Sequence, residues 1–315
     1  MSINLKEKLK YNKELKERFT TLNYAKSTQK MVRYLFEKTY SMESQLNKDI
    51  YEFNNDEVAM LMNQLELGST NSANSQRSYL KKYVAFCIQH GYLDTKINLF
   101  DKYNSNNMDR YVNQIAKRKR FIKDEEELNK ILNICKNPQD KVLIALLFEG
   151  VSGVHFEELV NLKETDVDGN LLMLTRDDGT ERILEVKDNT IKIIKDALDI
   201  DIYYPNNGKG TSSRREYMPI HDTGYVVRPT IHGDNNGKLN PIVINHRIKR
   251  IAEDYKNPHL NPRNIWISGM IQMAKELKAK LGRDLEKAEY EQINERFGKD
   301  IKYQYQTRKD IKEYI

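Results

Sequence analysis

The sequence predicts a mainly α-helical protein with a small β-sheet, divided into two domains. Apolar residues recur at helical spacing through most of the first hundred residues, whereas β-leaning runs stand out only around residues 170–186. A polar and basic stretch at 101–123 separates the two patterns. A chain of 315 residues is long enough for two domains that each bury a core.

The N-terminal half is predicted to be a module of four helices. The first covers residues 3–18, and Ser27 is expected to cap the second. Asn55 or Asp56 is expected to cap the third. The polar stretch 68–72 predicts a loop, followed by a fourth helix over 75–90 that Gly91 ends.

The C-terminal half mixes helices with a β-hairpin. Residues 124–163 have helical spacing, and the Asp177–Thr180 turn lies between two β-leaning runs, which predicts a hairpin. The span 203–240 is rich in Gly, Asn, Ser and Pro and predicts an elaborated loop region. Further helices are expected at 188–199, 241–255, 262–281 and 285–297.

Composition excludes several classes of protein. Hydrophobic residues make up 39% and charged residues 31%, and no apolar run approaches the roughly 20 residues that span a bilayer. The N-terminus has no apolar core, so we expect no secretory signal and no membrane partner. Cys87 and Cys135 lie in apolar helical patterns and are expected to be buried thiols in a reducing cytoplasm. Without metal-ligand spacing or a cofactor motif, we expect no metal and no other cofactor.

Basic residues cluster most densely at 117–123, with the sequence KRKRFIK, and the acidic run 124–127 follows at once. This change of sign indicates a linker followed by the acidic first turn of a helix. Clustered Lys and Arg bind DNA by neutralising phosphates. We therefore expect the linker to follow a DNA backbone through Lys117, Arg118, Lys119 and Arg120.

Four segments resemble the tyrosine recombinase (phage integrase) family. Residues 150–168, GVSGVHFEELVNLKETDVD, resemble the segment T-G-L-R-x-x-E-L-x-x-L-x-x-x-D-[IV]-D. The hairpin TRDDGTERILEV resembles K-x-x-x-x-R-x-V-P-L, with Arg182 in place. PRNIWISGM resembles H-x-L-R-H-x-F-A, and residues 297–315 resemble G-H-x-x-x-x-T-x-x-Y. The resemblance implies a helical core-binding domain at 1–108, a basic linker at 109–123 and a catalytic-like domain at 124–315.

The resemblance also implies where phosphoryl-transfer residues should lie, and most of them are missing. In the family a Tyr attacks the phosphate, two Arg clamp its oxygens, and Lys and His move protons. The first Arg position holds His155, and the Lys position holds Asp177, or Arg176 in a register shifted by one. Across the H-x-L-R-H segment and the tail, the positions hold Arg263, Trp266, Ile267, Lys299 and, near the nucleophile, Arg308, with Tyr303, Tyr305 and Tyr314 out of register. We expect a protein that is not an enzyme.

The parts that would grip DNA are retained. Two helix starts carry short polar and cationic side chains that can contact phosphates or base edges. Taken singly, Ser75 could equally be an N-cap, and the two lysines after Leu80 a solvated face. The predicted contacts in the helical domain are Lys26, Ser27, Lys30, Ser75, Arg77, Lys81 and Lys82. In the second domain they are Arg182, Arg214, Arg215, Arg247, Lys249, Arg250 and Arg263.

Our leading hypothesis is a sequence-specific binder of double-stranded DNA that represses transcription. Close to the whole chain resembles lysogeny repressors of temperate phages, which implies binding to operator-like repeats in the cytoplasm of a bacterial host, at the nucleoid. A divergent active integrase is the enzyme alternative, and an accessory protein that uses the 203–240 region is the third. The tail 298–315 either makes a contact between two copies or packs on its own domain.

Overall fold

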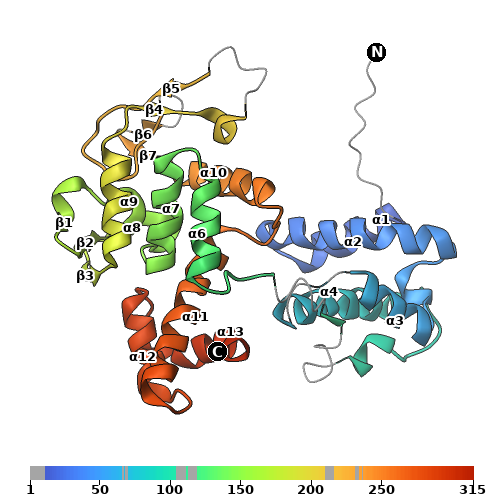
Figure 1. The fold of residues 1–315 in the computed structure, drawn as a ribbon. Helices are drawn as coiled ribbons and strands as arrows, with labels where there is room; N and C mark the ends of the chain where they lie inside the picture. Colours follow the sequence, from blue (N-terminus) through green and yellow to red (C-terminus); the bar gives the residue numbers. More distant parts are fainter. Residues whose placement is uncertain are drawn as a thin grey trace. The chain divides into compact units, whose positions relative to one another are not determined.

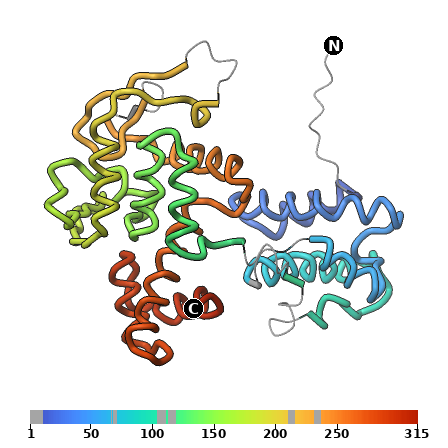
Figure 2. Tube along the Cα trace, in the orientation of Figure 1, coloured from blue at the N-terminus to red at the C-terminus, as the bar shows by residue number. Residues whose placement is uncertain are grey.

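The computed structural model describes residues 11–65, 67, 70–103, 111–112, 119–209, 216–230, 234–235 and 237–315. The chain forms two compact units, Met1–Arg118 and Lys119–Ile315. Figures 1 and 2 trace both units, which are described separately below. Helices predominate in both, and the strands form small antiparallel sheets, so the predicted fold class is confirmed.

The described part of the first unit is helical, but its helices do not begin where the sequence predicts. Ser27 lies inside the second helix, whose N-cap is Ala25 and makes no side-chain bond. Asn54, rather than Asn55 or Asp56, caps the third and accepts hydrogen bonds from the amides of Asp56 and Glu57. The unit contains α1 (Lys13–Asn23), α2 (Lys26–Leu46), α3 (Asn55–Gln64), α4 (Thr70–Gln89) and 3-10 turns at Ile50–Glu52 and Leu99–Lys102.

Two further boundaries correct the sequence analysis. Helix α1 runs to Asn23 rather than ending at residue 18. Helix α4 begins at Thr70, so the predicted loop is wrong for residues 70–72, and Ser75 lies within the helix rather than capping it. The end of α4 agrees with the prediction, because Gly91 follows it with a φ of +74°.

The core of the first unit contains a fully enclosed charge cluster. Lys16 pairs with Glu43 and lies 4.0 Å from Asp49, and all three side chains have no exposed surface. The hydroxyl of Tyr83 donates to Asp49 at 2.9 Å, and that of Thr39 donates to Glu43 at 2.8 Å. Around this cluster lie apolar side chains, and Cys87 is buried among them as a free thiol, as predicted.

The second unit contains the remaining helices and the strands. Its helices are α6 (Glu125–Ile134), α7 (Pro138–Glu149), α8 (Glu157–Asn161), α9 (Asp188–Leu198), α10 (Pro241–Asp254), α11 (Pro262–Leu281), α12 (Lys287–Arg296) and α13 (Gln304–Ile311). Its strands are β1 (Val167–Asp168), β2 (Leu171–Thr175), β3 (Glu181–Glu185), β4 (Ile202–Tyr203), β5 (Met218–Pro219), β6 (Asp234–Asn235) and β7 (Lys238–Leu239).

Helix α7 is the centre of the second unit. Seven of its residues are apolar and buried, and α6, α9, α10 and α11 pack around it (Figure 1). Helix α11 crosses it at Gly269, where an added Cβ would lie 1.8 Å from the carbonyl oxygen of Phe148. A glycine is therefore needed at this crossing. The crossing fixes α11 and with it the position of the helix start, where Arg263 and Trp266 lie.

The predicted hairpin is confirmed. Strands β1, β2 and β3 form an antiparallel sheet in which Leu174 pairs with Arg182. The turn closes through a hydrogen bond from the Arg176 amide to the Thr180 carbonyl, 2.9 Å long, and Gly179 supplies a φ of +83°. In the predicted loop region the described residues include the two short pairs β4–β5 and β6–β7.

The tail packs on its own unit. Ile311 of α13 is fully buried, and the buried Thr307 hydroxyl donates to the side-chain oxygen of Asn294 in α12 at 2.6 Å. Tyr314 stacks edge-on against Phe121, with 4.7 Å between ring centres. Of the two alternatives left open for residues 298–315, this structure has the intramolecular one.

Candidate functional site

Three of the predicted degenerate catalytic positions meet at one pocket in the second unit. The pocket has a volume of about 540 Å³ and is lined by Arg263 and Trp266 from α11 and by Lys299 from the segment after α12. Arg176, in the hairpin turn, is the fourth. Residues that are up to 123 positions apart in the chain thus share one surface.

The hairpin turn orients Arg176, not Asp177, toward the pocket. Asp177 accepts a hydrogen bond from the Asn161 side-chain amide at 3.0 Å and is not among the residues that line the pocket. The register shifted by one, which places Arg176 at the family's Lys position, is the one that brings a cation to the site.

A buried carboxylate organises the wall beside the pocket. Glu158 has no exposed side-chain surface and accepts hydrogen bonds from Arg182 on both oxygens, at 2.8 and 2.7 Å. Arg176 donates to the same carboxylate at 3.0 Å. Burial acts to raise the pKa of Glu158, but the bonds and charge of Arg182, with the Ser152 amide and Arg176, outweigh burial and hold that pKa below its ordinary value. The cluster carries one negative and two positive charges.

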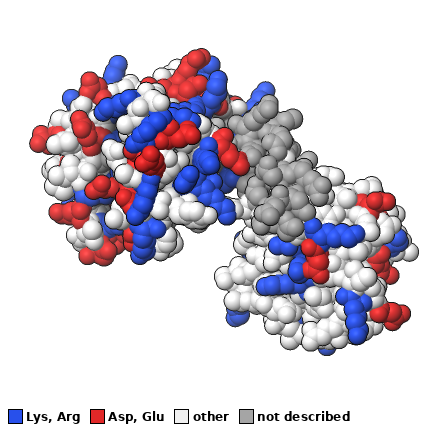
Figure 3. Space-filling model, turned by 90° about the horizontal axis from the view of Figure 1, so that it is seen from below, with Lys and Arg blue, Asp and Glu red and all other residues white. Residues whose placement is uncertain are grey.

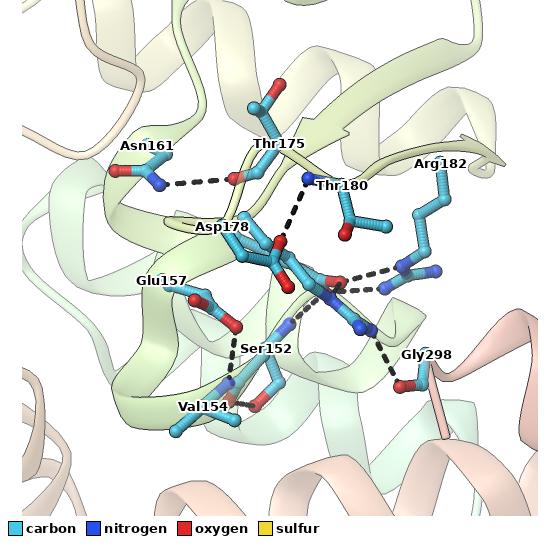
Figure 4. Close-up of polar contacts among 12 residues, drawn as sticks. Ser152, Val154, Glu157, Asn161, Thr175, Asp178, Thr180, Arg182 and Gly298 are labelled. Carbon is cyan, nitrogen blue, oxygen red and sulfur yellow. Dashed lines mark hydrogen bonds and ion pairs between the residues drawn. The ribbon is translucent and has the colours of Figure 1, made fainter. Parts of the chain in front are cut away.

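Each of the three guanidinium nitrogens of Arg182 donates a hydrogen bond within this cluster. Besides Glu158, its guanidinium donates to the carbonyls of Arg296 at 2.7 Å and Gly150 at 2.9 Å. In Figure 4 it extends from β3 toward the segment that carries Gly298. The geometry gives Arg182, predicted to contact DNA, a structural role that joins the hairpin to α7, α8 and the end of α12.

Gly298 is a close-approach position at the same wall. Its carbonyl accepts a hydrogen bond from Arg176 at 2.8 Å, and its φ is +65°. A Cβ there would lie 2.9 Å from the Arg176 guanidinium and 3.1 Å from that of Arg182. Only glycine lets the chain pass this close to both arginines while it carries Lys299 to the pocket.

The position of the family's first Arg lies on an unusual piece of backbone. His155 and Phe156 have φ values of +52° and +66°, in the left-handed region that non-glycine residues rarely adopt. Val154 and Phe156 line the pocket. His155, which lies between them in the sequence, is exposed and is not among the lining residues. The Glu157 carboxylate accepts a bond from the Val154 amide at 3.0 Å and so supports this turn (Figure 4).

Aromatic and cationic groups adjoin one another in the pocket. The ammonium of Lys299 lies 6.0 Å from the centre of the Trp266 ring and donates to the Thr307 hydroxyl at 2.6 Å. Burial lowers the pKa of Lys299, Asp310 opposes this shift, and Arg263 adds to it. Trp266 packs edge-on against Phe297 at 5.9 Å, and its indole N–H is enclosed without a hydrogen-bond partner among the described residues.

The remaining positions of the catalytic set do not reach the pocket. Ile267 is buried in the apolar cluster between α11, α12 and α13. Tyr303 and Tyr305 are exposed, and Tyr314 packs against Phe121. Arg308 is exposed on α13. The described residues that line the pocket include no tyrosine.

In the first unit, the exposed residues of α2 include three lysines and no Asp or Glu. Its exposed residues are Lys26, Ser27, Lys30, Met31, Tyr34, Lys38, Ser41, Ser44 and Gln45. Of the two glutamates in α2, Glu43 is fully buried and Glu37 is half-buried. The Lys38 ammonium lies over the Tyr34 ring at 5.2 Å. These exposed residues therefore combine three cations with neutral hydrogen-bonding groups.

Helix α4 contributes a neighbouring surface. Its sequence contains no Asp or Glu. The Lys82 ammonium lies 5.7 Å from the ring of Tyr24, just before α2, and Tyr79 packs on the same ring at 5.4 Å. Exposed Lys82 and the start of α2 therefore lie together, with Ser75 exposed farther along α4.

Two α4 side chains are already engaged within the unit. Arg77 is half-buried and donates to the Tyr103 carbonyl at 2.6 Å, and Lys81 pairs with Asp101. Their predicted DNA contacts would compete with these bonds. In the described part of the chain, no side-chain hydrogen bond or ion pair competes with the predicted contacts of Lys26, Ser27, Lys30, Ser75 and Lys82.

The other basic residues fall into three groups. Lys119 is exposed, and Arg120 is half-buried over the Phe121 ring at 5.0 Å. Lys117, Arg118, Arg214 and Arg215 lie outside the described residues. The expectation that Arg247 tracks a DNA backbone is wrong, because it is buried and lies 3.8 Å from Asp140, while Lys249 is exposed and Arg250 half-exposed.

Charges of both signs are mixed on one face of the molecule. On the face shown in Figure 3, Lys and Arg are interspersed with Asp and Glu in both units. Among the described residues no helix is long and apolar enough to cross a membrane. Nor do the described His, Cys, Asp and Glu residues gather into a group that could hold a metal ion.

Sequence reasoning missed part of the pocket wall. The predicted site residues do not include Glu158, Gly298, Phe297 or Asn245 of α10, of which the last three line the pocket. The Glu-Glu-Leu of the first resembling segment was the one available signal for Glu158. Its partners lie 18 and 24 residues away, and no local pattern connects them.

Family models match both parts of the chain. The model described as "MrpR, C-terminal catalytic domain" matches residues 122–315, and "MrpR, N-terminal core-binding domain" matches residues 9–89. A similar protein is the SPbeta prophage-derived uncharacterized protein YopR of Bacillus subtilis (strain 168). It is 26% identical over 311 residues, which cover 97% of this chain and 94% of that protein.

Solved structures with detectable similarity include two recombinases. A lambda integrase dimer bound to a COC′ core site is 13% identical, with a TM-score of 0.49, over 94% of this chain and 76% of that one. The XerA recombinase is 16% identical, with a TM-score of 0.40, over 94% of this chain and 92% of that one.

Proposed function

The chain belongs to the MrpR family, and from that premise we propose that it is a sequence-specific double-stranded-DNA-binding protein that represses transcription in a temperate phage. The core-binding name of the N-terminal model supports the first half of the proposal. The prophage origin of the similar Bacillus subtilis protein supports the second. Maintenance of lysogeny through operator-like repeats, at the nucleoid of the host, is the form of repression that we propose.

The observation that carries the proposal is that the exposed residues of α2 and α4 include four lysines and no Asp or Glu. The negative phosphates of duplex DNA repel exposed carboxylates. Lys and Arg bind favourably because they neutralise phosphates and release condensed counterions. Here Lys26, Lys30 and Lys38 are exposed on α2 and Lys82 on α4. Ser27 on α2 and Ser75 on α4 are also exposed. Lysines position the protein on phosphates, whereas the hydroxyl and amide groups beside them can contact base edges.

Genome-wide footprinting of the bound sites, followed by titration of one bound duplex at several salt concentrations, tests the proposal. We expect log affinity to fall linearly with log salt. Lys30→Gln and Lys82→Gln should each flatten that slope by about one unit. Lys192→Gln, an exposed lysine of α9, is the matched control and should leave the slope unchanged.

Two results would contradict the proposal in different ways. A footprint that is indifferent to sequence would overturn repression at specific operators while leaving DNA binding intact. No duplex binding at low salt would overturn both and favour an accessory protein.

We propose further that the protein does not cut DNA. The clamping positions hold His155 and Trp266, and an indole cannot hold a phosphate between two hydrogen bonds as a guanidinium does. A nicked suicide duplex should therefore trap no covalent adduct. An adduct on Tyr303, Tyr305 or Tyr314 would establish the divergent integrase instead.

Self-association on DNA is a separate proposal. Since α13 packs on its own unit, we expect copies to assemble through another surface, and sedimentation on a duplex with one or two repeats measures it. Removing residues 304–315 should unfold the α11–α13 cluster rather than merely dissociate a dimer, because Ile311 and Thr307 are buried in it.

A further inference from the structure

The pocket beside Glu158 combines features that suit a small ligand better than a strand of duplex DNA. Its volume of about 540 Å³ lies within the range of about 300–1,000 Å³ that is usual for small-molecule sites. The lining residues include three cations, Arg176, Arg263 and Lys299, and no carboxylate. An anionic group would therefore be attracted by cations from three different segments of the chain.

The cations keep donors for such a group. Arg176 uses its Nε for Glu158 and Nη2 for the Gly298 carbonyl, and Lys299 gives one of its three N–H groups to Thr307. Arg263, at the start of α11, is exposed. Because Glu158 is shared between Arg176 and Arg182, it does not neutralise both of them.

The walls between the cations are aromatic. Phe156, Trp266 and Phe297 line the pocket, and the exposed Val154 adds to its apolar rim. Flat rings stack favourably on such side chains. Ser152 and Asn245 are polar lining groups that could orient the ligand. In an intact duplex the bases are stacked inside the helix, so a DNA phosphate would bring no ring to these walls.

We propose that this pocket binds a free aromatic anion of the nucleoside monophosphate class, with the phosphate among Arg176, Arg263 and Lys299 and the ring on the aromatic wall. The site is built from the second unit alone, and the proposal does not depend on DNA binding by α2 and α4. The pocket would then bind a ligand at the place where the family resemblance implies that catalysis has been lost.

Trp266 provides the measurement, because it is the chain's single tryptophan and lines the pocket. Tryptophan fluorescence of the full-length chain, excited at the red edge, should change saturably when AMP is added. Adenosine supplies the ring without the anion and ribose 5-phosphate the anion without the ring. We expect each to bind at least ten-fold more weakly than AMP.

Variants separate the pocket from general charge effects. Arg263→Met and Lys299→Met should each weaken AMP binding about ten-fold. Lys302→Met, three residues beyond Lys299 and exposed, is the control and should bind AMP as the unaltered chain does. Because Arg263 is exposed, its replacement leaves the core intact, which circular dichroism checks.

Any of four outcomes would overturn the proposal. The first is that tryptophan fluorescence shows no saturable change up to roughly 10 mM AMP. The second is that AMP and ribose 5-phosphate bind equally well, and the third is that Lys302→Met and Arg263→Met weaken AMP binding equally. Displacement of AMP by a duplex that lacks any footprinted site would also overturn it, since the pocket would then be a DNA phosphate site.

Discussion

The two units each contain a buried ionic cluster, and the clusters are built in opposite ways. In the first unit one ammonium, Lys16, faces the carboxylates of Glu43 and Asp49, all without exposed surface. In the second, one carboxylate, Glu158, faces the guanidiniums of Arg176 and Arg182, which are 28% and 17% exposed. The first cluster is closed and has more carboxyl groups than cations, whereas the second borders a pocket and has more cations than carboxylates.

The comparison separates two roles of buried charge: the closed cluster only stabilises the fold, whereas the open cluster leaves charged groups available to a ligand. A closed cluster can interact with nothing outside, so its bonds to Tyr83 and Thr39 serve only to satisfy buried groups. An open cluster leaves donors at a surface. Arg182 donates to the Arg296 carbonyl and stabilises the structure beside the pocket, whereas Arg176 lines the pocket itself.

The largest expected effect is at the closed cluster. Lys16→Met leaves two carboxyls buried without a cation, which should lower the free energy of unfolding by about 3–5 kcal/mol. Chemical denaturation of the full chain measures this loss. Lys16→Met combined with Glu43→Leu removes the pair together and should recover much of it. If Lys16→Met lowered the free energy of unfolding by less than Arg182→Met does, the view that full burial makes the loss of a charge partner more destabilising would be contradicted.

Arg182→Met should have a smaller but still large effect. It removes the bidentate partner of Glu158 and leaves two carbonyls without their donor, yet Arg176 still neutralises the carboxylate. We expect the free energy of unfolding to fall by about 2–3 kcal/mol, below the full cost of breaking a buried pair. Arg182→Lys keeps the charge but not the fork, and should recover less than half. Full recovery by Lys would show that geometry is unimportant here.

The smallest expected effect is on pH dependence, where the clusters should differ in sign. Burial raises the pKa of Glu43 from 4.5 to about 7, against the opposing effect of Lys16. Between those values the folded state holds a proton that the unfolded state has released, so stability falls as pH rises from about 5 to 7. The lowered pKa of Glu158 gives the reverse, a contribution lost only as pH falls below its ordinary range.

Denaturation at several pH values tests this sign. Glu43→Gln should flatten the fall between pH 5 and 7, and Glu158→Gln should leave that window unchanged. An unaltered slope in Glu43→Gln would mean that Asp49, whose pKa is also raised by burial, holds the proton instead.

Local chemistry made some elements of this fold predictable. The bounds of α11 follow from Pro262 in its first turn, Asn261 as its cap and Gly282 after its end, all of which are local signals. The hairpin follows from the Asp-Gly turn between two alternating runs. In contrast, the sequence pattern did not predict the first turn of α4, because its residues are polar. They form a helical turn only as an extension of the helix that follows them.

The candidate site was predictable as positions but not as an arrangement. The resemblance placed Arg263, Trp266 and Lys299, and the structure brings these three to one pocket. The choice between Arg176 and Asp177 depended on the direction of the turn, which no spacing determines. The Glu158 cluster depends on bonds between segments far apart in sequence, and Arg247 was misjudged because its buried partner Asp140 lies 107 residues earlier.

Arg182 also has a consequence for the time course of folding. Its bonds reach Glu158, Gly150 and Arg296, at sequence separations of 24, 32 and 114 residues. The bond to the end of α12 can form only after most of the second unit has assembled, so we expect it to be absent from the transition state. Loss of this arginine should then hasten unfolding while refolding keeps its rate, which makes Arg182 a determinant of how long the folded unit persists.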